Sequence, residues 1–88
     1  MHLEMRHLRY FCAVARELSF SRAAEQLHIA QPPLSRQIRD LEEELGAELL
    51  DRGSRPLRLT PAGRFFQIQA QQILDRMSEV QAATTRVA

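Results

Sequence analysis

The residues from Ser19 to Leu45 restrict the fold most, because they combine two short helical patterns with one break between them. The first helix is predicted over about 20–27, since Ser19 is a good N-cap and is followed by alanines and a leucine at helical spacing. The three residues 28–30 leave room only for a turn. A second helix over about 31–45 then begins with two prolines, which a first helical turn tolerates because their missing N–H would be unpaired there.

The second helix has two different faces. At about 100° per residue, one narrow stripe collects four apolar residues: Leu34, Ile38, Leu41 and Leu45. The far side carries polar and proline residues near the helix start, with Gln31 at its edge: Pro32, Ser35, Arg36 and Arg39. Arginine is the side chain best suited to bidentate contact with guanine in the major groove of DNA, and helix-turn-helix proteins direct this end of their second helix at base edges. Taken alone, such a helix is more often a solvated amphipathic helix than a DNA-reading one; the rest of the chain reverses that preference.

Composition limits the class of protein. The 88 residues allow one domain, and with 44% hydrophobic residues its core is small enough to gain from dimerisation. We expect no membrane span and a cytoplasmic location, because no apolar run approaches eighteen residues and no signal segment opens the chain. The single cysteine, Cys12, lies on an apolar helical face and is expected to be a buried thiol. We expect no metal, because His2 and His7 lack ligand partners at useful spacing, and no cofactor.

The net charge of +1 is distributed unevenly. Residues 1–41 carry six Arg against four acidic residues, and residues 42–51 carry five acidic residues and no base. Residues 52–64 carry four Arg and no acidic residue, and the remainder is balanced. A basic stretch beside an acidic one predicts a surface with a definite orientation towards a polyanion. The acidic end of the second helix, 40–44, should therefore lie away from phosphates.

The flanking segments complete the domain. A helix over about 6–17 presents an apolar face of Leu8, Phe11, Cys12, Ala15 and Leu18, which should form a three-helix core with Ala23, Leu27, Leu34 and Ile38. Gly46 is expected to end the second helix of the pair. Short alternating runs flank the loop 52–56, which predicts a two-stranded wing over about 48–59. Arg55 at its tip is a candidate for a narrow minor groove, where negative potential attracts arginine; a solvated turn is the alternative.

The C-terminal third predicts one long helix. Thr60 is a good N-cap and Pro61 a good first residue, and no helix breaker follows before about Arg86. Apolar residues recur with heptad spacing, which indicates a dimerisation seam formed by Phe66, Ala70, Ile73, Met77 and Val80. At 1.5 Å per residue the helix is roughly 39 Å long. One small domain cannot cover that length, so the apolar face is expected to need a second chain.

With these elements in place, the sequence resembles the N-terminal part of a LysR-type transcriptional regulator. The resemblance covers about residues 3–63 and rests on Leu8-x-x-Phe11, Ser19-Phe-Ser-Arg-Ala-Ala24, Leu27-His-Ile-Ala-Gln-Pro-Pro-Leu-Ser-Arg-Gln-Ile38, Leu41-Glu-x-x-Leu-Gly46, Leu49-Leu-x-Arg52 and Leu59-Thr-x-Ala-Gly63. The stretch from His28 to Gly46 is most similar to regulators of aromatic and chloroaromatic catabolism. Two residues depart from the family pattern: Ala30 stands where serine is common, and Leu50 where phenylalanine is common.

The resemblance implies a mainly α fold, in which a winged helix-turn-helix over 3–60 (the helix-turn-helix itself about 20–39) precedes a linker helix over 61–87. It implies base-edge contacts by Gln31, Pro32, Ser35 and Arg36, a minor-groove contact by Arg55, and phosphate or positioning roles for Ser21, Arg22, Pro33, Arg39 and Arg52. It also implies a homodimer through the linker helix, a tetramer of the full-length protein, and a palindromic site with a T–A spaced core. Family members carry a C-terminal effector domain that binds a small-molecule inducer, and this chain stops where that domain would begin.

We therefore expect a sequence-specific, dimeric DNA-binding domain of an activator that controls aromatic-compound catabolism. The alternative is a protein-interaction or dimerisation module without sequence-specific DNA binding, which the acidic run Glu42-Glu-Glu44 would suit. An enzyme is not expected, because the sequence shows no carboxylate pair in a pocket, no nucleophile–base pair and no phosphate loop.

Overall fold

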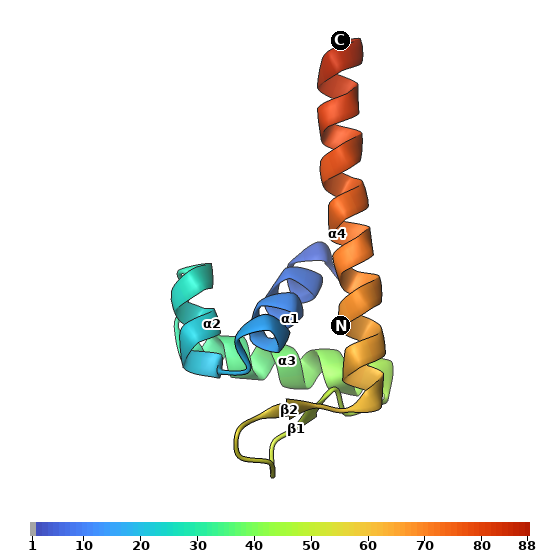
Figure 1. Cartoon of the computed structure of the whole chain (residues 1–88). Coiled ribbons are helices and arrows are strands. Elements are labelled where there is room, and N and C mark those ends of the chain that lie inside the picture. The colour runs from blue at the N-terminus through green and yellow to red at the C-terminus, as the bar shows by residue number, and fades with distance from the viewer. Residues whose placement is uncertain (1) are drawn as a thin grey trace.

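A computed structural model describes residues 2–88 of the chain, which form helices and one small sheet. Their order is α1 (Met5–Glu17), α2 (Phe20–Leu27), α3 (Gln31–Leu45), β1 (Leu50–Asp51), β2 (Arg58–Leu59) and α4 (Pro61–Val87). The first three helices pack together, and α4 rises from the sheet past α1 and continues well beyond it (Figure 1). The molecule is accordingly elongated, 49 × 26 × 24 Å. The predicted fold class, a three-helix core with a two-stranded wing and a long final helix, is confirmed.

The helix ends follow from local chemistry. The hydroxyl of Ser19 accepts a hydrogen bond from the Arg22 N–H at 3.2 Å, and α3 ends at Gly46 with φ of 67°, as predicted for both residues. Leu18 ends α1 in the left-handed region, with φ of 50°. The sequence pattern places Leu18 on the buried face of α1, and this prediction is wrong. The reversal of the chain at Leu18 turns its side chain off that face and leaves it 38% exposed.

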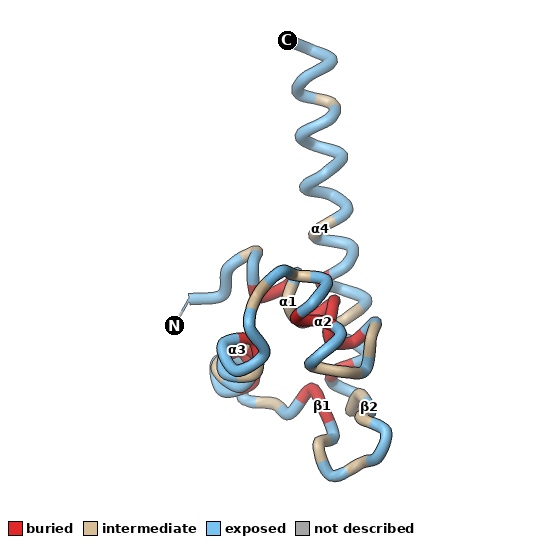
Figure 2. The backbone as a smooth tube through the Cα atoms, turned by 90° about the vertical axis from the view of Figure 1, so that its left-hand side faces the viewer, coloured by how far each residue is buried: buried red, intermediate tan, exposed pale blue. Residues whose placement is uncertain are grey.

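The main core lies where α1, α2 and α3 meet. Phe11, Val14, Leu34 and Ile38 are fully buried there, and burial of each such side chain contributes about 1.5–3 kcal/mol. In Figure 2 the buried segments gather in this compact part, whereas the outer turns of α4 are exposed. Leu45, which the periodicity assigns to the same apolar stripe, is 38% exposed because it is the last residue of α3.

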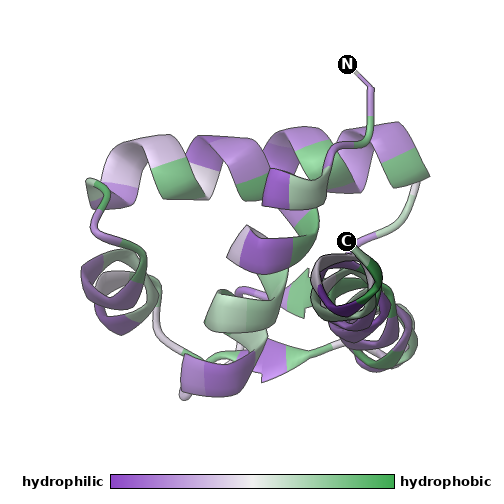
Figure 3. Ribbon diagram, turned by 90° about the horizontal axis from the view of Figure 1, so that it is seen from above, coloured by the Kyte–Doolittle hydropathy of each residue, from purple (hydrophilic) through white to green (hydrophobic). Residues whose placement is uncertain are grey.

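A second apolar cluster joins α1 to the first turns of α4. Ala70 is fully buried against Leu8 and Cys12, and Phe66 packs on both clusters, with its ring 5.5 Å from that of Phe11 at 66°. The sequence pattern assigns Phe66 and Ala70 to a dimerisation seam. Within this chain, α1 covers Ala70 completely and Phe66 in part. Figure 3, which looks along α4, shows it standing beside the other helices.

His7 has a structural role that the sequence did not reveal. It is only 2% exposed, and its Nδ1 accepts a hydrogen bond from the Glu4 N–H at 2.9 Å, which caps the start of α1. Within residues 2–88, no cluster of three or more His, Cys, Asp or Glu side chains is placed to hold a metal ion. The same residues contain no helix that combines the length and apolarity needed to cross a membrane.

Candidate nucleic-acid interface

The start of α3 is an exposed, polar part of the compact domain. Leu34, Ile38 and Leu41 are fully buried and fix the back of the helix to the core. On the opposite side, the residues predicted to face DNA are exposed, except Ser35, which is half-buried: Gln31, Pro32, Pro33, Ser35, Arg36 and Arg39. The helix therefore presents this face to solvent while its orientation is set by the core.

The first turn of α3 is open to a partner. Ala30 provides no side-chain cap, as the departure from the family pattern predicted. Pro32 and Pro33 have no N–H, so two of the four donors that a helix start leaves unpaired are missing, and the absent cap costs correspondingly little. The Gln31 amide donates to the Ser35 hydroxyl at 2.9 Å. This bond holds a donor–acceptor pair in place on the exposed face.

Three arginine side chains, two on α3 and one in the loop of the wing, carry positive charge that no ion pair within the described residues neutralises. Arg36, Arg39 and Arg55 are exposed, and none of them forms an ion pair or a side-chain hydrogen bond within the described part of the chain. A guanidinium offers five N–H donors in a fixed plane, which matches phosphate oxygens and the guanine edge. Their donors are thus available to an external acceptor.

The two predicted DNA contacts on α2, Ser21 and Arg22, have weaker structural support. Ser21 is exposed, and Arg22 is 69% exposed and lies 3.8 Å from a carboxylate oxygen of Glu17. An ion pair this open contributes little to stability. Arg22 therefore remains available as a phosphate contact beside α3.

The wing is short and polar at its tip. Leu50 pairs with Leu59 and Asp51 with Arg58 in antiparallel register, so each strand has two residues where the sequence had suggested longer runs. Turn bonds order the loop, including one from the Gly53 N–H to the Asp51 carboxylate at 3.2 Å. Arg55 is exposed in the loop between β1 and β2, and this loop lies at the opposite end of the molecule from the free end of α4 (Figure 1).

Arg52 differs from the other candidates because its guanidinium is engaged inside the fold. Its Nη1 lies 2.8 Å from the Glu42 carboxylate, its Nη2 is buried, and its guanidinium carbon stands 5.9 Å from the centre of the Phe20 ring. These contacts join α2, α3 and the wing. Of the two roles that the resemblance left open, the geometry favours positioning over phosphate binding.

Glu42 is the residue of this region that sequence reasoning missed. It is 8% exposed, and one carboxylate oxygen accepts hydrogen bonds from the N–H groups of Leu49 at 2.7 Å and Leu50 at 3.2 Å. The charge pattern groups Glu42 with a solvated acidic end, which is wrong for this residue. Its spacing carried the signal, because position 42 follows Ile38 by four residues and so lies on the buried stripe of α3.

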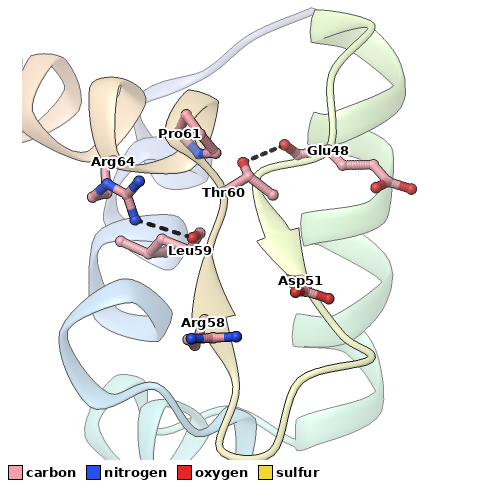
Figure 4. A pocket seen from close by; sticks show the side chains of 7 residues that line it. All are labelled: Glu48, Asp51, Arg58, Leu59, Thr60, Pro61 and Arg64. Atoms are coloured by element: carbon pink, nitrogen blue, oxygen red, sulfur yellow. Dashed lines mark hydrogen bonds between the residues drawn. The ribbon is translucent and has the colours of Figure 1, made fainter.

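A groove at the base of the wing is a weaker candidate. Glu48 and Asp51 line it together with Arg58 and Arg64 (Figure 4). The two carboxylates and two guanidiniums oppose each other, so the groove favours neither an anion nor a cation. The strongest candidate surface is therefore the exposed face of α3 together with the tip of the wing.

Comparisons with known proteins find relatives that match nearly the whole chain. The family model for bacterial regulatory helix-turn-helix proteins of the lysR family matches residues 5–64. The chain is 62% identical over 85 residues to the probable cat1 operon transcriptional activator of Acinetobacter lwoffii, covering 97% of this chain and 28% of that protein. It is 56% identical over 86 residues to the HTH-type transcriptional regulator BenM of Acinetobacter baylyi, covering 98% of this chain and 28% of BenM.

A solved structure extends the similarity to the whole fold. The structure of the BenM DBD in complex with benA site 1 DNA superposes with a TM-score of 0.95 at 56% identity, over 98% of this chain and 100% of that one. The chain spans less than a third of the length of the two curated relatives.

Proposed function

The chain belongs to the LysR family of bacterial regulatory helix-turn-helix proteins, and from this premise we propose that it is a sequence-specific DNA-binding domain. In this proposal α3 enters the major groove with Gln31, Pro32, Ser35 and Arg36 at base edges. Arg55 of the wing enters the adjacent minor groove. Arg39, Pro33, Ser21 and Arg22 contact or lie against the phosphate backbone.

One observation carries the proposal: the exposed end of α3 holds uncompensated arginine donors on a helix whose back is fully buried. A contact surface fixed in this way loses little conformational entropy on binding. The BenM DBD, whose structure is that of a DNA complex, shares the fold and 56% of the sequence. These two facts together favour double-stranded DNA over a protein partner.

We further propose that two copies associate through α4. Its outer turns expose an apolar stripe, with Ile73 at 49%, Met77 at 43% and Val80 at 45%, and these three residues recur at heptad positions. A second copy of the same stripe is the occupant that a heptad pattern indicates. The proposed dimer seam therefore keeps Ile73, Met77 and Val80 from the sequence prediction and omits Phe66 and Ala70.

The proposal for the protein as a whole is wider. Its relatives are longer chains, and one is named a transcriptional activator of an operon. We propose a bacterial, cytoplasmic activator of aromatic-compound catabolic genes that assembles as a tetramer on a palindromic site. In this proposal, the full-length protein binds its small-molecule inducer through a separate effector domain.

DNA binding tests the first proposal directly. Fluorescence anisotropy with benA site 1 DNA and with a scrambled duplex of the same length, each at several salt concentrations, gives both specificity and the salt slope. We expect Arg36→Ala to lose about 1–3 kcal/mol on the specific site and to relax discrimination at one base pair. Arg39→Ala should weaken both duplexes alike and lower the salt slope by about one.

Arg76→Ala is the matched control, because Arg76 is an exposed arginine on the outer part of α4. It removes the same charge far from α3 and should leave the ratio of specific to scrambled binding unchanged. Equal losses for Arg36→Ala on both duplexes would contradict base recognition by α3. A wild-type chain that binds neither duplex even at low salt would favour the alternative, a protein-interaction module.

A further inference from the structure

A compact joint connects α3 to the start of α4 through the segment Glu48–Leu50. On one side, the Glu42 carboxylate of α3 accepts the N–H groups of Leu49 and Leu50. On the other, the Leu49 carbonyl accepts the Thr60 N–H at 3.0 Å, and the Thr60 hydroxyl donates to the Glu48 carbonyl at 2.6 Å (Figure 4). The same hydroxyl accepts the Gly63 N–H at 3.0 Å, so it also caps α4.

Gly63 allows the closest approach within this joint. It is buried in the first turn of α4, and a Cβ added there would overlap the Leu49 carbonyl oxygen and lie 2.9 Å from the carbonyl carbon. Both atoms belong to the backbone that Glu42 and Thr60 hold in place, so they cannot move aside as a flexible side chain would. Backbone contacts at this joint therefore hold the start of α4 against the segment that follows α3, and the packing of Ala70 on α1 is the second contact that sets the angle of α4.

We propose that this joint of Glu42, Leu49, Thr60 and Gly63 sets the distance between the two half-sites of DNA that a dimer accepts. The inference rests on the proposed function, in which α3 reads each half-site and α4 joins the two copies. In that arrangement α4 runs from the domain that holds α3 to the dimer axis, attached by this joint and by its packing on α1. Any change of angle at the joint changes the separation of the two α3 helices.

The length of α4 makes this separation sensitive to small movements. A Cβ at position 63 would lie 1.9 Å from the Leu49 carbonyl oxygen, so an ordinary contact near 3.5 Å requires the start of α4 to move by about 1.5 Å. Ala70, buried against α1, is the next fixed point and lies about 10 Å further along the axis. Pivoting there moves Val80, about 15 Å beyond, by roughly 2 Å in each copy. Two copies give about 4 Å, slightly more than the rise of one base pair.

The test uses benA site 1 DNA and a panel of duplexes in which its centre is lengthened or shortened by one and two base pairs. Thr60→Val removes both side-chain bonds of the joint while keeping the size of the side chain, and Thr60→Ser keeps both bonds. Gly63→Ala introduces the overlap. Gly53→Ala is the matched control for a glycine substitution, because a Cβ at Gly53 meets only the Asp51 carboxylate at an ordinary 3.5 Å.

We expect the wild-type chain, Thr60→Ser and Gly53→Ala to share one preferred spacing. Gly63→Ala should shift the preferred spacing by about one base pair. Thr60→Val should instead reduce, several-fold, the ratio of the affinities for the best and the second-best spacing. Circular dichroism confirms that each variant is folded, and Thr60→Val tests the joint even where Gly63→Ala does not fold. A merely structural role would weaken all spacings equally.

Two results would overturn the inference. One is that Thr60→Val and Gly63→Ala keep the wild-type order and ratios across the panel; the other is that the wild-type chain binds all spacings equally. If the wild-type chain binds none of the duplexes, the proposed function is contradicted. The inference, which rests on that function, is then contradicted as well.

Discussion

Replacement of Glu42 by alanine should destabilise the chain more than any other substitution of an acidic residue in α3. The carboxylate accepts three bonds: from Leu49 N–H at 2.7 Å, Leu50 N–H at 3.2 Å and Arg52 Nη1 at 2.8 Å. Alanine leaves two buried backbone donors without an acceptor, at about 1–3 kcal/mol each. Arg52 also loses its partner, but its side chain is 28% exposed, so water relieves part of that loss.

The expected total is about 3–5 kcal/mol, the range seen when one partner of a buried ion pair is removed. For a domain of this size that corresponds to a fall in Tm of roughly 15–30 °C. Glu42→Gln should lose less, about 1–2 kcal/mol, because its carbonyl oxygen still accepts the two backbone N–H groups. Its amide nitrogen, however, would then face the donor of Arg52.

Urea unfolding followed by circular dichroism at one fixed protein concentration measures these differences. Glu43→Ala is the control, because Glu43 is the exposed neighbour on the same helix. In a double-mutant cycle, Glu42→Ala and Arg52→Ala should be less than additive, since each removes the same ion pair. If Glu42→Ala costs no more than Glu43→Ala, the reasoning about the buried carboxylate is wrong.

The remaining predictions concern α4 and the single thiol. Met77→Glu should convert the dimer into monomers at micromolar concentration, as measured by analytical ultracentrifugation. Ser78→Glu, which lies on another face of α4, is the control and should leave the dimer intact. A monomeric wild type would contradict the proposed seam. Burial raises the pKa of the Cys12 thiol above its ordinary value, and the positive charge of Arg16 offsets only part of that rise. The stabilising contribution of the neutral thiol is therefore complete below about pH 9 and lost as the pH rises through the folded-state pKa. The stability advantage of the wild type over Cys12→Ala should accordingly shrink between pH 7.5 and 10 in urea titrations; an unchanged difference would contradict it.

The periodicity of the sequence predicted the helices well, because each helix has one face that must be buried. The spacing of Leu34, Ile38 and Leu41 fixed the exposed face of α3, and the N-cap residues Ser19 and Thr60 marked where two helices begin. Periodicity failed at helix ends. Leu18 and Leu45 continue the apolar pattern, but no core lies beneath the last residue of a helix, and a left-handed residue redirects the side chain.

The periodicity also does not predict which neighbour covers an apolar face. Phe66, Ala70, Ile73 and Met77 belong to one heptad repeat, yet the first two pack on α1 and the last two are exposed. A heptad repeat shows that a stripe is apolar along its whole length. It does not show at which residue the stripe stops packing on the domain. The same limit applies to Glu42, because composition counts an acidic side chain as solvated until the backbone donors that it meets are known.

The placement of charge along α3 explains how a chain of net charge +1 can present a polyanion-binding surface. The aligned peptide dipoles of a helix place partial positive charge at its start and negative charge at its end. Arg36 adds positive charge in the half of α3 that already carries the positive end of the dipole, and Glu43 adds negative charge near the negative end, so the dipole disfavours both placements. Folding alone would select the opposite order. The buried acidic residue of this run, Glu42, is paired with Arg52, so the exposed charges that remain on α3 are Arg36 and Arg39 towards its start and Glu43 towards its end. We expect this order to attract a duplex to the start of the helix and to disfavour its approach to the end, which would orient docking before any base is contacted.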